Sequence, residues 1–153
     1  MYCSFCETPL GKLLLGEEND HLVCLRFSGE PIPERAEFRE TPLLREATHQ
    51  LRAYFSRKLK DFSLPLAPRG TPFQKAVWQA LLGVPYGTTT SYGEIAARVG
   101  NPRAARAVGM ANNKNRIVII IPCHRIIGSN GRLVGYGGGL DIKQRLLNLE
   151  AMG

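Results

Sequence analysis

The chain has 153 residues and a net charge of +7, which is enough length for one or two small domains with a sizeable core. No apolar run is long enough to span a bilayer and neither end resembles a signal peptide, so we expect a cytoplasmic protein with no membrane partner. The excess charge lies in the second half: residues 1–70 carry ten Lys and Arg against ten Asp and Glu, whereas residues 71–153 carry ten against three. This asymmetry is typical of a solvated basic face or of a protein that binds a polyanion, most often nucleic acid.

The first half predicts a small α/β domain, an antiparallel sheet with one helix. Apolar-rich runs at 11–16 and 22–27, separated by a polar turn, indicate a β-hairpin. Thr41 and Pro42 supply an N-cap and a preset first residue for a helix that runs to about Lys58. This half carries no catalytic signal of its own.

Four cysteines are too few and too unevenly spread for a disulfide scaffold, so reduced thiols are expected. Three of them, with a nearby histidine, would make four zinc ligands in number. Their spacing is not that of a standard zinc module, so ordinary strand-end thiols are the favoured interpretation and no metal is predicted. These residues are Cys3, Cys6, Cys24 and His21.

A stretch rich in proline and glycine, 65–71, interrupts any periodic pattern and predicts a domain boundary. We assign residues 1–65 to the N-terminal α/β domain and 66–71 to a linker. Residues 72–153 are predicted to form a mostly α C-terminal domain with a winged-helix-like helix-turn-helix.

The helix-turn-helix is predicted from capping signals. A Thr-Pro pair starts a helix over 72–82, and a Ser-x-x-Glu capping box opens a short helix over 91–99. Gly100 ends that helix, and Asn101 caps a second helix over 102–113. Two short helices joined by a tight glycine turn are the pattern of this motif, although many helical hairpins bind nothing.

The composition of the second helix favours DNA binding. Arg103 and Arg106 lie one turn apart, and the residues between and after them are mostly alanine and glycine. Small residues allow a helix backbone to come close to a groove. Sequence-specific regulators usually read the major groove with polar side chains, and this helix offers few.

A thiol, an imidazole and a guanidinium follow one another at Cys123, His124 and Arg125. The β-branched run at 117–121 predicts a short buried strand, which Pro122 ends because it has no N–H to donate. A lone cysteine is most often a core residue. The neighbouring groups favour a nucleophile instead, because a histidine or arginine lowers the pKa of a thiol and the thiolate is the reactive form.

The C-terminal segment contains three consecutive glycines before a last helix from about Asp141. The glycines predict either a hinge or a wall pressed against a flat ligand. Glu150 lies near the end of the helix, where a carboxylate is solvated by default.

The segment Ile121-Pro-Cys-His-Arg-Ile126 resembles the active-site motif of the 6-O-methylguanine-DNA methyltransferases. The similarity extends without a gap over residues 71–150, whereas the first half fits only the less constrained N-terminal domain of that family. The further matching segments are Ser91-Tyr92, Arg103–Gly109, Asn115, Tyr136–Leu140, Lys143 and Glu150.

The resemblance implies that Cys123 accepts the alkyl group, that His124 takes the thiol proton through a water, and that Glu150 orients the imidazole. A structural role for Glu150, tying down the last helix, is the alternative. Direct displacement of an alkyl group needs a thiolate and a means of neutralising the purine, but no cofactor. The product is a thioether that no residue here cleaves, so each molecule is expected to react once.

The resemblance also implies roles for the surrounding residues. Asn115 would hold the turn before the active-site segment, and Tyr92 and Lys143 would be donors that favour the leaving guanine. The second helix would enter the minor groove of double-stranded DNA with little sequence preference, and the extruded base would contact the backbone near Cys123. The remaining residues assigned to DNA binding are Arg103, Ala105, Gly109, Arg125 and Arg106, which takes the place of the extruded base; those assigned to substrate binding are Ile126, Tyr136 and Gly137.

One departure is that Asn115 is followed by Arg116, where many relatives carry proline. We expect a monomer, with repair of 4-O-methylthymine as a less favoured additional activity. The main rival function is a binding module that recognises alkylated bases without repair, but such relatives replace the acceptor cysteine, which is present here as Cys123. A helix-turn-helix regulator with a sensing cysteine is the second rival, and a cysteine hydrolase is the third.

Overall fold

The computed structural model describes residues 1–128, 131 and 139–152. It divides into two compact units, Met1–Pro68 and Arg69–Gly153, each with its own core. Within the described residues, no helix is both long and apolar enough to cross a membrane.

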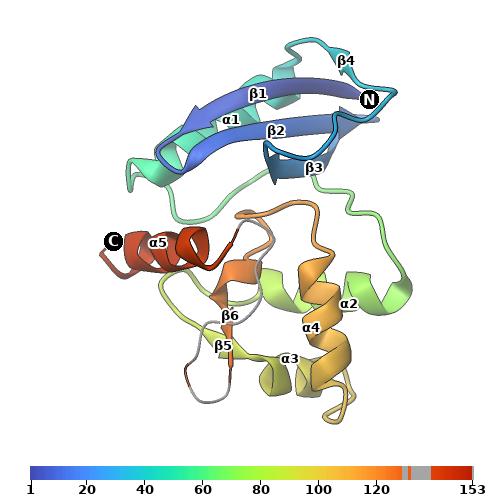
Figure 1. The fold of residues 1–153 in the computed structure, drawn as a ribbon, viewed down its shortest axis with the longest axis vertical. Helices are drawn as coiled ribbons and strands as arrows, with labels where there is room; N and C mark the ends of the chain where they lie inside the picture. The colour runs from blue at the N-terminus through green and yellow to red at the C-terminus, as the bar shows by residue number, and fades with distance from the viewer. Residues whose placement is uncertain (129–130, 132–138, 153) are drawn as a thin grey trace. The chain divides into compact units, whose positions relative to one another are not determined.

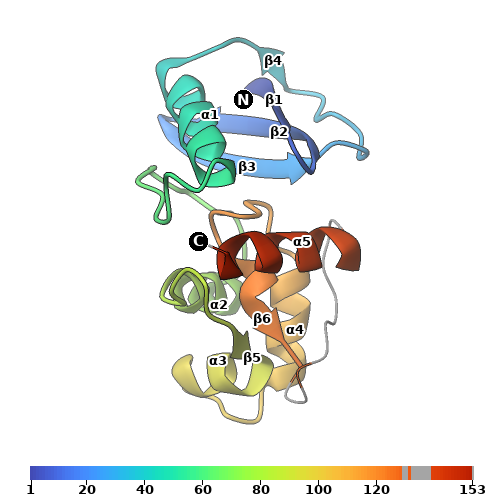
Figure 2. The ribbon, with the colours of Figure 1, turned by 90° about the vertical axis from the view of Figure 1, so that its left-hand side faces the viewer.

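The first unit is a four-stranded sheet covered on one face by a helix (Figures 1 and 2). The order is β3-β2-β1-β4, with β1, β2 and β3 antiparallel. The sheet is mixed rather than purely antiparallel, because the two-residue β4 pairs parallel with β1. The elements are β1 (Tyr2–Thr8), β2 (Gly11–Glu18), β3 (His21–Phe27), β4 (Glu37–Phe38) and α1 (Pro42–Phe55).

Local signals explain the predicted hairpin and helix of this unit. Asn19 and Asp20 both adopt positive φ (51° and 61°), which produces the tight turn between β2 and β3. The Thr41 side chain accepts a hydrogen bond from the backbone N–H of Leu44 at 3.1 Å and caps α1. The helix ends at Phe55, before the predicted Lys58.

The second unit is mostly helical, and a two-stranded parallel pair lies among its helices (Figure 2). The buried indole of Trp78 donates from Nε1 to the carbonyl of Ala111 at 2.9 Å, which ties α2 to α4. The elements are α2 (Pro72–Leu82), β5 (Thr90–Ser91), α3 (Tyr92–Arg98), α4 (Ala105–Asn113), the 3₁₀ turn η1 (Cys123–Arg125), β6 (Ile126–Ile127) and α5 (Leu140–Ala151).

The predicted helix-turn-helix corresponds to α3 and α4. Gly100 has φ +88° and makes the turn between them. The second helix begins at Ala105 rather than 102, because Asn101 starts a further turn: its carbonyl accepts from the N–H of Ala104 at 3.0 Å and its side chain from the N–H of Arg103 at 3.3 Å.

The predicted strand over 117–121 is wrong, because Ile117 makes only a single β-bridge and residues 118–121 form tight turns. The N–H of Ile120 donates to the carbonyl of Val118 at 2.8 Å across Ile119, whose φ is +72°. This is a γ-turn, an uncommon conformation for a β-branched residue. The run is buried as expected, but burial and β-branching alone do not distinguish a strand from a buried loop.

Candidate active site

Cys123 lies at the start of η1, directly after a second tight turn. The N–H of Cys123 donates to the carbonyl of Ile121 at 2.7 Å across Pro122, whose φ and ψ of −81° and 63° are those of an inverse γ-turn. The thiol-bearing residue is 3% exposed. The reversal of the chain therefore presents Cys123 from a rigid, buried turn.

Asn115 closes this loop from both ends. Its Nδ2 donates to the carbonyl of Ile121 at 2.9 Å, and its Oδ1 accepts from the N–H of Ile117 at 2.9 Å. A hydrogen bond from the same side chain also lowers the pKa of Cys123. Asn115 thus holds the turn, as implied by the resemblance, and contacts the thiol as well.

Burial outweighs these stabilising contacts at the thiol. It raises the pKa of Cys123 from 9.0 to about 11, although the Asn115 hydrogen bond and the charge of Lys143 act in the opposite direction. The expected net lowering of this pKa is therefore wrong for the resting protein: neighbouring groups do lower it, but they are Asn115 and Lys143 rather than His124 or Arg125, and burial has the larger effect. At neutral pH the group is a thiol, and reaction requires an acceptor for its proton.

His124 and Glu150 form a buried pair. Nε2 of His124 lies 2.8 Å from Oε2 of Glu150, and the two residues are 0% and 3% exposed. Because a carboxylate only accepts hydrogen bonds, Nε2 carries the hydrogen and Nδ1 carries the lone pair. Burial lowers the pKa of His124, against the raising effect of Glu150, which favours the neutral imidazole.

The Nδ1 atom of His124 is buried and has no hydrogen-bond partner among the described residues. A neutral imidazole whose buried acceptor pairs with no described residue, on the residue that follows Cys123 in the chain, is suited to receive a proton. The default expectation of a solvated Glu150 is wrong, because this carboxylate is a buried acceptor.

Arg125 does not present its guanidinium to solvent, which corrects its assignment to DNA binding. Its Nε donates to Oε1 of Glu150 at 2.8 Å, and its Nη2 donates to Oε2 at 3.0 Å. Nη1 donates to the carbonyl of Val84 at 2.7 Å, and the guanidinium carbon lies 5.7 Å from the centre of the Tyr86 ring. The side chain is 8% exposed and is used within the protein.

Lys143 and Tyr92 share the electrostatic environment of Cys123. Lys143 is fully buried, and burial lowers its pKa from 10.5 to about 8, although Cys123 acts in the opposite direction. The pKa of Tyr92 is raised, first by burial and then by Cys123. An ammonium group and a phenol, both of which can give up a proton, therefore lie close enough to Cys123 for its charge to affect their pKa values.

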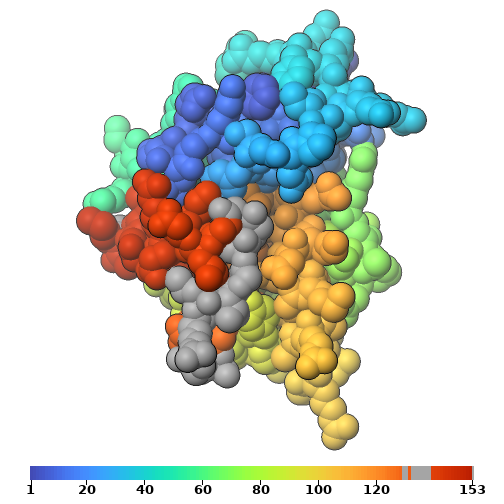
Figure 3. All heavy atoms as spheres, viewed as in Figure 1, coloured from blue at the N-terminus to red at the C-terminus, as the bar shows by residue number. Residues whose placement is uncertain are grey.

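The residues assigned to DNA binding lie on α4 and in the turn before it, and α4 is visible on the face of the second unit that Figure 3 shows. Arg103 and Arg106 are exposed, and Ala105 and Gly109 are half-buried. Met110, one turn after Arg106, is 66% exposed. This face combines two cations with small and apolar side chains.

Of the residues assigned to substrate binding, the structure describes only one. Ile126 is buried in β6 directly after η1, whereas Tyr136 and Gly137 lie outside the described residues. Asn112 makes a contact that the sequence did not predict: its Nδ2 lies 3.4 Å from the carbonyl of Cys123. Its position shortly before the Asn115 loop was visible in the sequence, but nothing there indicated that its side chain points inward.

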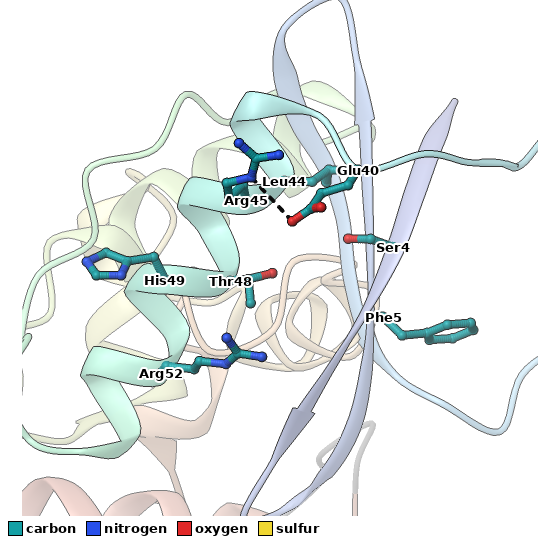
Figure 4. A pocket seen from close by; sticks show the side chains of 8 residues that line it. All are labelled: Ser4, Phe5, Glu40, Leu44, Arg45, Thr48, His49 and Arg52. Carbon is teal, nitrogen blue, oxygen red and sulfur yellow. Dashed lines mark hydrogen bonds and ion pairs between the residues drawn. The ribbon is translucent and has the colours of Figure 1, made fainter.

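The first unit contains a hollow of about 360 Å³ between α1 and β1 (Figure 4). Arg45 and Glu40 form an exposed ion pair of 3.3 Å at its edge, and no thiol or other strong nucleophile lines it. In the described part of the chain, no three His, Cys, Asp or Glu residues are arranged to hold a metal. The lining residues are Ser4, Phe5, Glu40, Leu44, Arg45, Thr48, His49 and Arg52.

Two family models match the chain, one for each unit. Residues 1–68 match the 6-O-methylguanine DNA methyltransferase ribonuclease-like domain, and residues 72–152 match the DNA binding domain of the same family. The chain belongs to the 6-O-methylguanine DNA methyltransferase family. The resemblance stated from the active-site hexapeptide is thereby confirmed.

Curated relatives in this family match over almost their whole length. The methylated-DNA–protein-cysteine methyltransferase of Methanosarcina barkeri is 54% identical over 153 residues, covering 98% of this chain and 97% of the relative. The constitutive enzyme of Bacillus subtilis is 49% identical over 156 residues, covering 97% and 94%. The predicted enzyme class, a methyltransferase of this type, is confirmed by these relatives.

Solved structures of the family share the fold. The structure of Mycobacterium tuberculosis OGT in complex with DNA has a TM-score of 0.93 and 45% sequence identity, covering 99% of this chain and 94% of that one. The Mycobacterium tuberculosis O6-methylguanine methyltransferase has a TM-score of 0.90, also at 45% identity. The predicted fold class, a small α/β domain before a helical DNA-binding domain, is confirmed.

Proposed function

We propose that this methyltransferase repairs DNA by transferring an alkyl group from oxygen-6 of guanine to the sulfur of its own Cys123, once per molecule. The observation that carries the proposal is the buried Cys123, followed in the chain by a neutral His124 whose Nδ1 accepts no hydrogen bond from any described residue. This pair lies in the unit that matches the family's DNA binding domain.

Side chains of this protein can both accept the proton of the thiol and supply the proton that the leaving guanine needs. His124 accepts the thiol proton at Nδ1, through one water, while Glu150 holds the opposite ring nitrogen. The S–C bond forms as the C–O bond breaks, and the electron pair of that bond stays on the guanine. Lys143 or Tyr92 supplies the proton that makes the leaving guanine neutral. No cofactor enters this scheme.

The raised thiol pKa is compatible with this chemistry. A thiol with a pKa of about 11 is inert toward most electrophiles at neutral pH, so unwanted alkylation is suppressed. Reaction begins when a base takes the proton in the presence of the positioned alkyl carbon. The product thioether lies in a closed site with no described residue placed to hydrolyse it, which supports a single turnover.

DNA recognition is assigned to α4. The helix would enter the minor groove, with Arg106 filling the space left by the extruded nucleotide and Arg103 contacting phosphate. The charge excess of residues 71–153 supports binding with little sequence preference. A 45% identical relative has been crystallised with DNA, which supports the same partner here.

Intact-mass spectrometry after incubation with a 6-O-methylguanine duplex tests this function. One methyl group is expected on the peptide that contains Cys123, and Cys123→Ala should remove it, whereas the matched change Cys24→Ala should leave it in place. Turnover beyond one equivalent, or a methyl group on another residue, would refute self-alkylation at Cys123.

A further inference from the structure

Arg125 and His124 share one carboxylate. Three N–H groups converge on Glu150: Nε and Nη2 of Arg125 at 2.8 and 3.0 Å, and Nε2 of His124 at 2.8 Å. All three side chains are almost fully buried. The guanidinium donates one hydrogen bond to each carboxylate oxygen, which is the strongest geometry for such a pair.

A third hydrogen bond anchors Arg125 itself. Nη1 donates at 2.7 Å to the carbonyl of Val84, in the segment that follows α2. The carboxylate on α5 is thus connected through Arg125 to a different part of the unit, which holds it in hydrogen-bond contact with His124. Adjacent residues of η1 therefore hold the same carboxylate from two sides.

The charge of Arg125 affects the imidazole. The imidazole of His124 experiences the charges of the Glu150 carboxylate, the Arg125 guanidinium and the Lys143 ammonium. Without Arg125, the buried carboxylate would lose the guanidinium that compensates its charge, and a less compensated buried anion favours the protonated form of the neighbouring His124. A protonated His124 has no lone pair on Nδ1 and cannot act as the base.

We propose that Arg125 is a positioning residue for alkyl transfer: it neutralises and orients Glu150, so that His124 remains neutral with its proton on Nε2 and its acceptor on Nδ1. This inference deepens the proposed function and rests on it for the role of His124. The physical cause lies in the buried ion pair, and it predicts a property of the resting protein that does not depend on alkyl transfer.

The first test is the titration of His124 in Arg125→Gln, followed by the imidazole NMR signals. The pKa of His124 lies below its ordinary value in the wild type because of burial, with the charges of Arg125 and Lys143 contributing. Removing Arg125 should raise the pKa of His124, because one of the charges that lower it is lost while the raising effect of Glu150 remains. The matched control Arg98→Gln removes the same charge from the exposed end of α3 and should leave the titration unchanged. An unchanged His124 titration in Arg125→Gln would overturn the proposal.

The second test is the pH profile of the reaction with free 6-O-methylguanine base, which avoids effects on DNA binding. In Arg125→Gln the acidic limb of the rate should move to higher pH by the same shift, so that the loss is largest at acidic pH and smallest at alkaline pH. A purely structural role would lower the rate equally at every pH. That uniform loss would also contradict the proposal.

Two further variants guard against misfolding, because Arg125→Gln leaves a buried carboxylate without its guanidinium. Arg125→Lys retains a charge but loses the two-point geometry, so the acidic limb should stay near its wild-type position while the rate falls. In Arg125→Met/Glu150→Gln both charges are absent, and the titration of His124 should return to low pH. A high His124 pKa in this double variant would refute the electrostatic cause.

Different experimental results would refute the proposed function and the proposed role of Arg125. If wild-type protein is not alkylated at Cys123, the proposed function fails, whereas the shift of the His124 titration between wild type and Arg125→Gln still tests the ion pair. If Cys123 is alkylated but the titration and the acidic limb do not move, the function stands and the role of Arg125 is refuted.

Discussion

Burial of the Lys143 side chain lowers the stability of the folded protein at neutral pH. Its amine is fully buried, and burial lowers its pKa from 10.5 to about 8. A cation that is easier to deprotonate when folded destabilises the folded state at neutral pH. That cost is present in full below about pH 8 and fades as the pH rises to 10.5, where the unfolded chain also loses the proton.

Lys143→Met should therefore stabilise the protein while slowing alkyl transfer. We expect the free energy of unfolding at pH 7 to rise by up to about 3 kcal/mol, with the gain disappearing near pH 10.5. Urea unfolding at both pH values measures this. Lys114→Met, at an exposed position after α4, is the matched control and should change stability little. A gain that is the same at both pH values would argue against a charge effect.

The loop before η1 depends on one amide. Asn115 makes two hydrogen bonds of 2.9 Å to the backbone of the buried turn and a third interaction with the thiol. Asn115→Ala should lower the free energy of unfolding by about 1–3 kcal/mol, because buried backbone groups lose their partners. It should also raise the pKa of Cys123 further, since one stabilising hydrogen bond to the thiolate is lost.

Chemical denaturation and the pH dependence of thiol reactivity measure the two effects of Asn115→Ala. Asn113→Ala is the matched control, because Asn113 is exposed at the end of α4. Equal losses in the two variants would show that the loop does not depend on this amide.

At the scale of the helix, a substitution at Gly109 should have opposite effects on stability and on DNA affinity. A Cβ added to Gly109 would lie 3.5 and 3.7 Å from two ring carbons of Tyr92, which is ordinary contact. The fold therefore does not require glycine here, and a helix interior favours alanine by about 1 kcal/mol. Gly109→Ala should raise the melting temperature but lower duplex affinity several-fold, if α4 approaches the groove as closely as proposed.

Gly93→Ala on α3 is the counterpart for this experiment. Its added Cβ would meet only Ser91 Oγ, at 3.9 Å, so it should raise the melting temperature without affecting DNA affinity. Fluorescence anisotropy with a labelled duplex distinguishes the two. Unchanged affinity in Gly109→Ala would exclude close approach of this helix face.

For the whole molecule, the decisive property is the uneven distribution of charge. The first 70 residues are balanced and the remainder carries the excess of +7. Duplex affinity should therefore fall steeply with added salt. Arg103→Ala should reduce the dependence of log affinity on log salt by roughly one unit, because it removes a phosphate contact, whereas Arg106→Ala should slow repair in duplex more than reaction with free 6-O-methylguanine base.

Lys58→Ala, at an exposed position in the first unit, removes the same charge from the balanced half and should change neither the salt dependence nor the repair rate. Equal losses on duplex and free base in Arg106→Ala would show that this side chain does not hold the extruded state.

The sequence alone determined the local elements and the chemical identity of the site. Thr41, Ser91 and Gly100 begin or end helices through short-range capping and backbone preferences, which are visible in any window of a few residues. The hexapeptide at 121–126 identified the family, and the family models confirm it. These signals each involve only a few neighbouring residues, so they can be recognised without knowing the tertiary structure.

Tertiary structure decided what depends on burial and on contacts between distant residues. The partnership of Glu150 with His124 and Arg125 joins positions 26 and 25 residues apart, and no periodicity reports it. The run at 117–121 forms buried turns rather than a strand, because the Asn115 side chain and carbonyls of the run itself pair with several of its backbone groups. The thiol of Cys123 is protonated at rest because burial raises its pKa by more than the Asn115 hydrogen bond and the charge of Lys143 lower it.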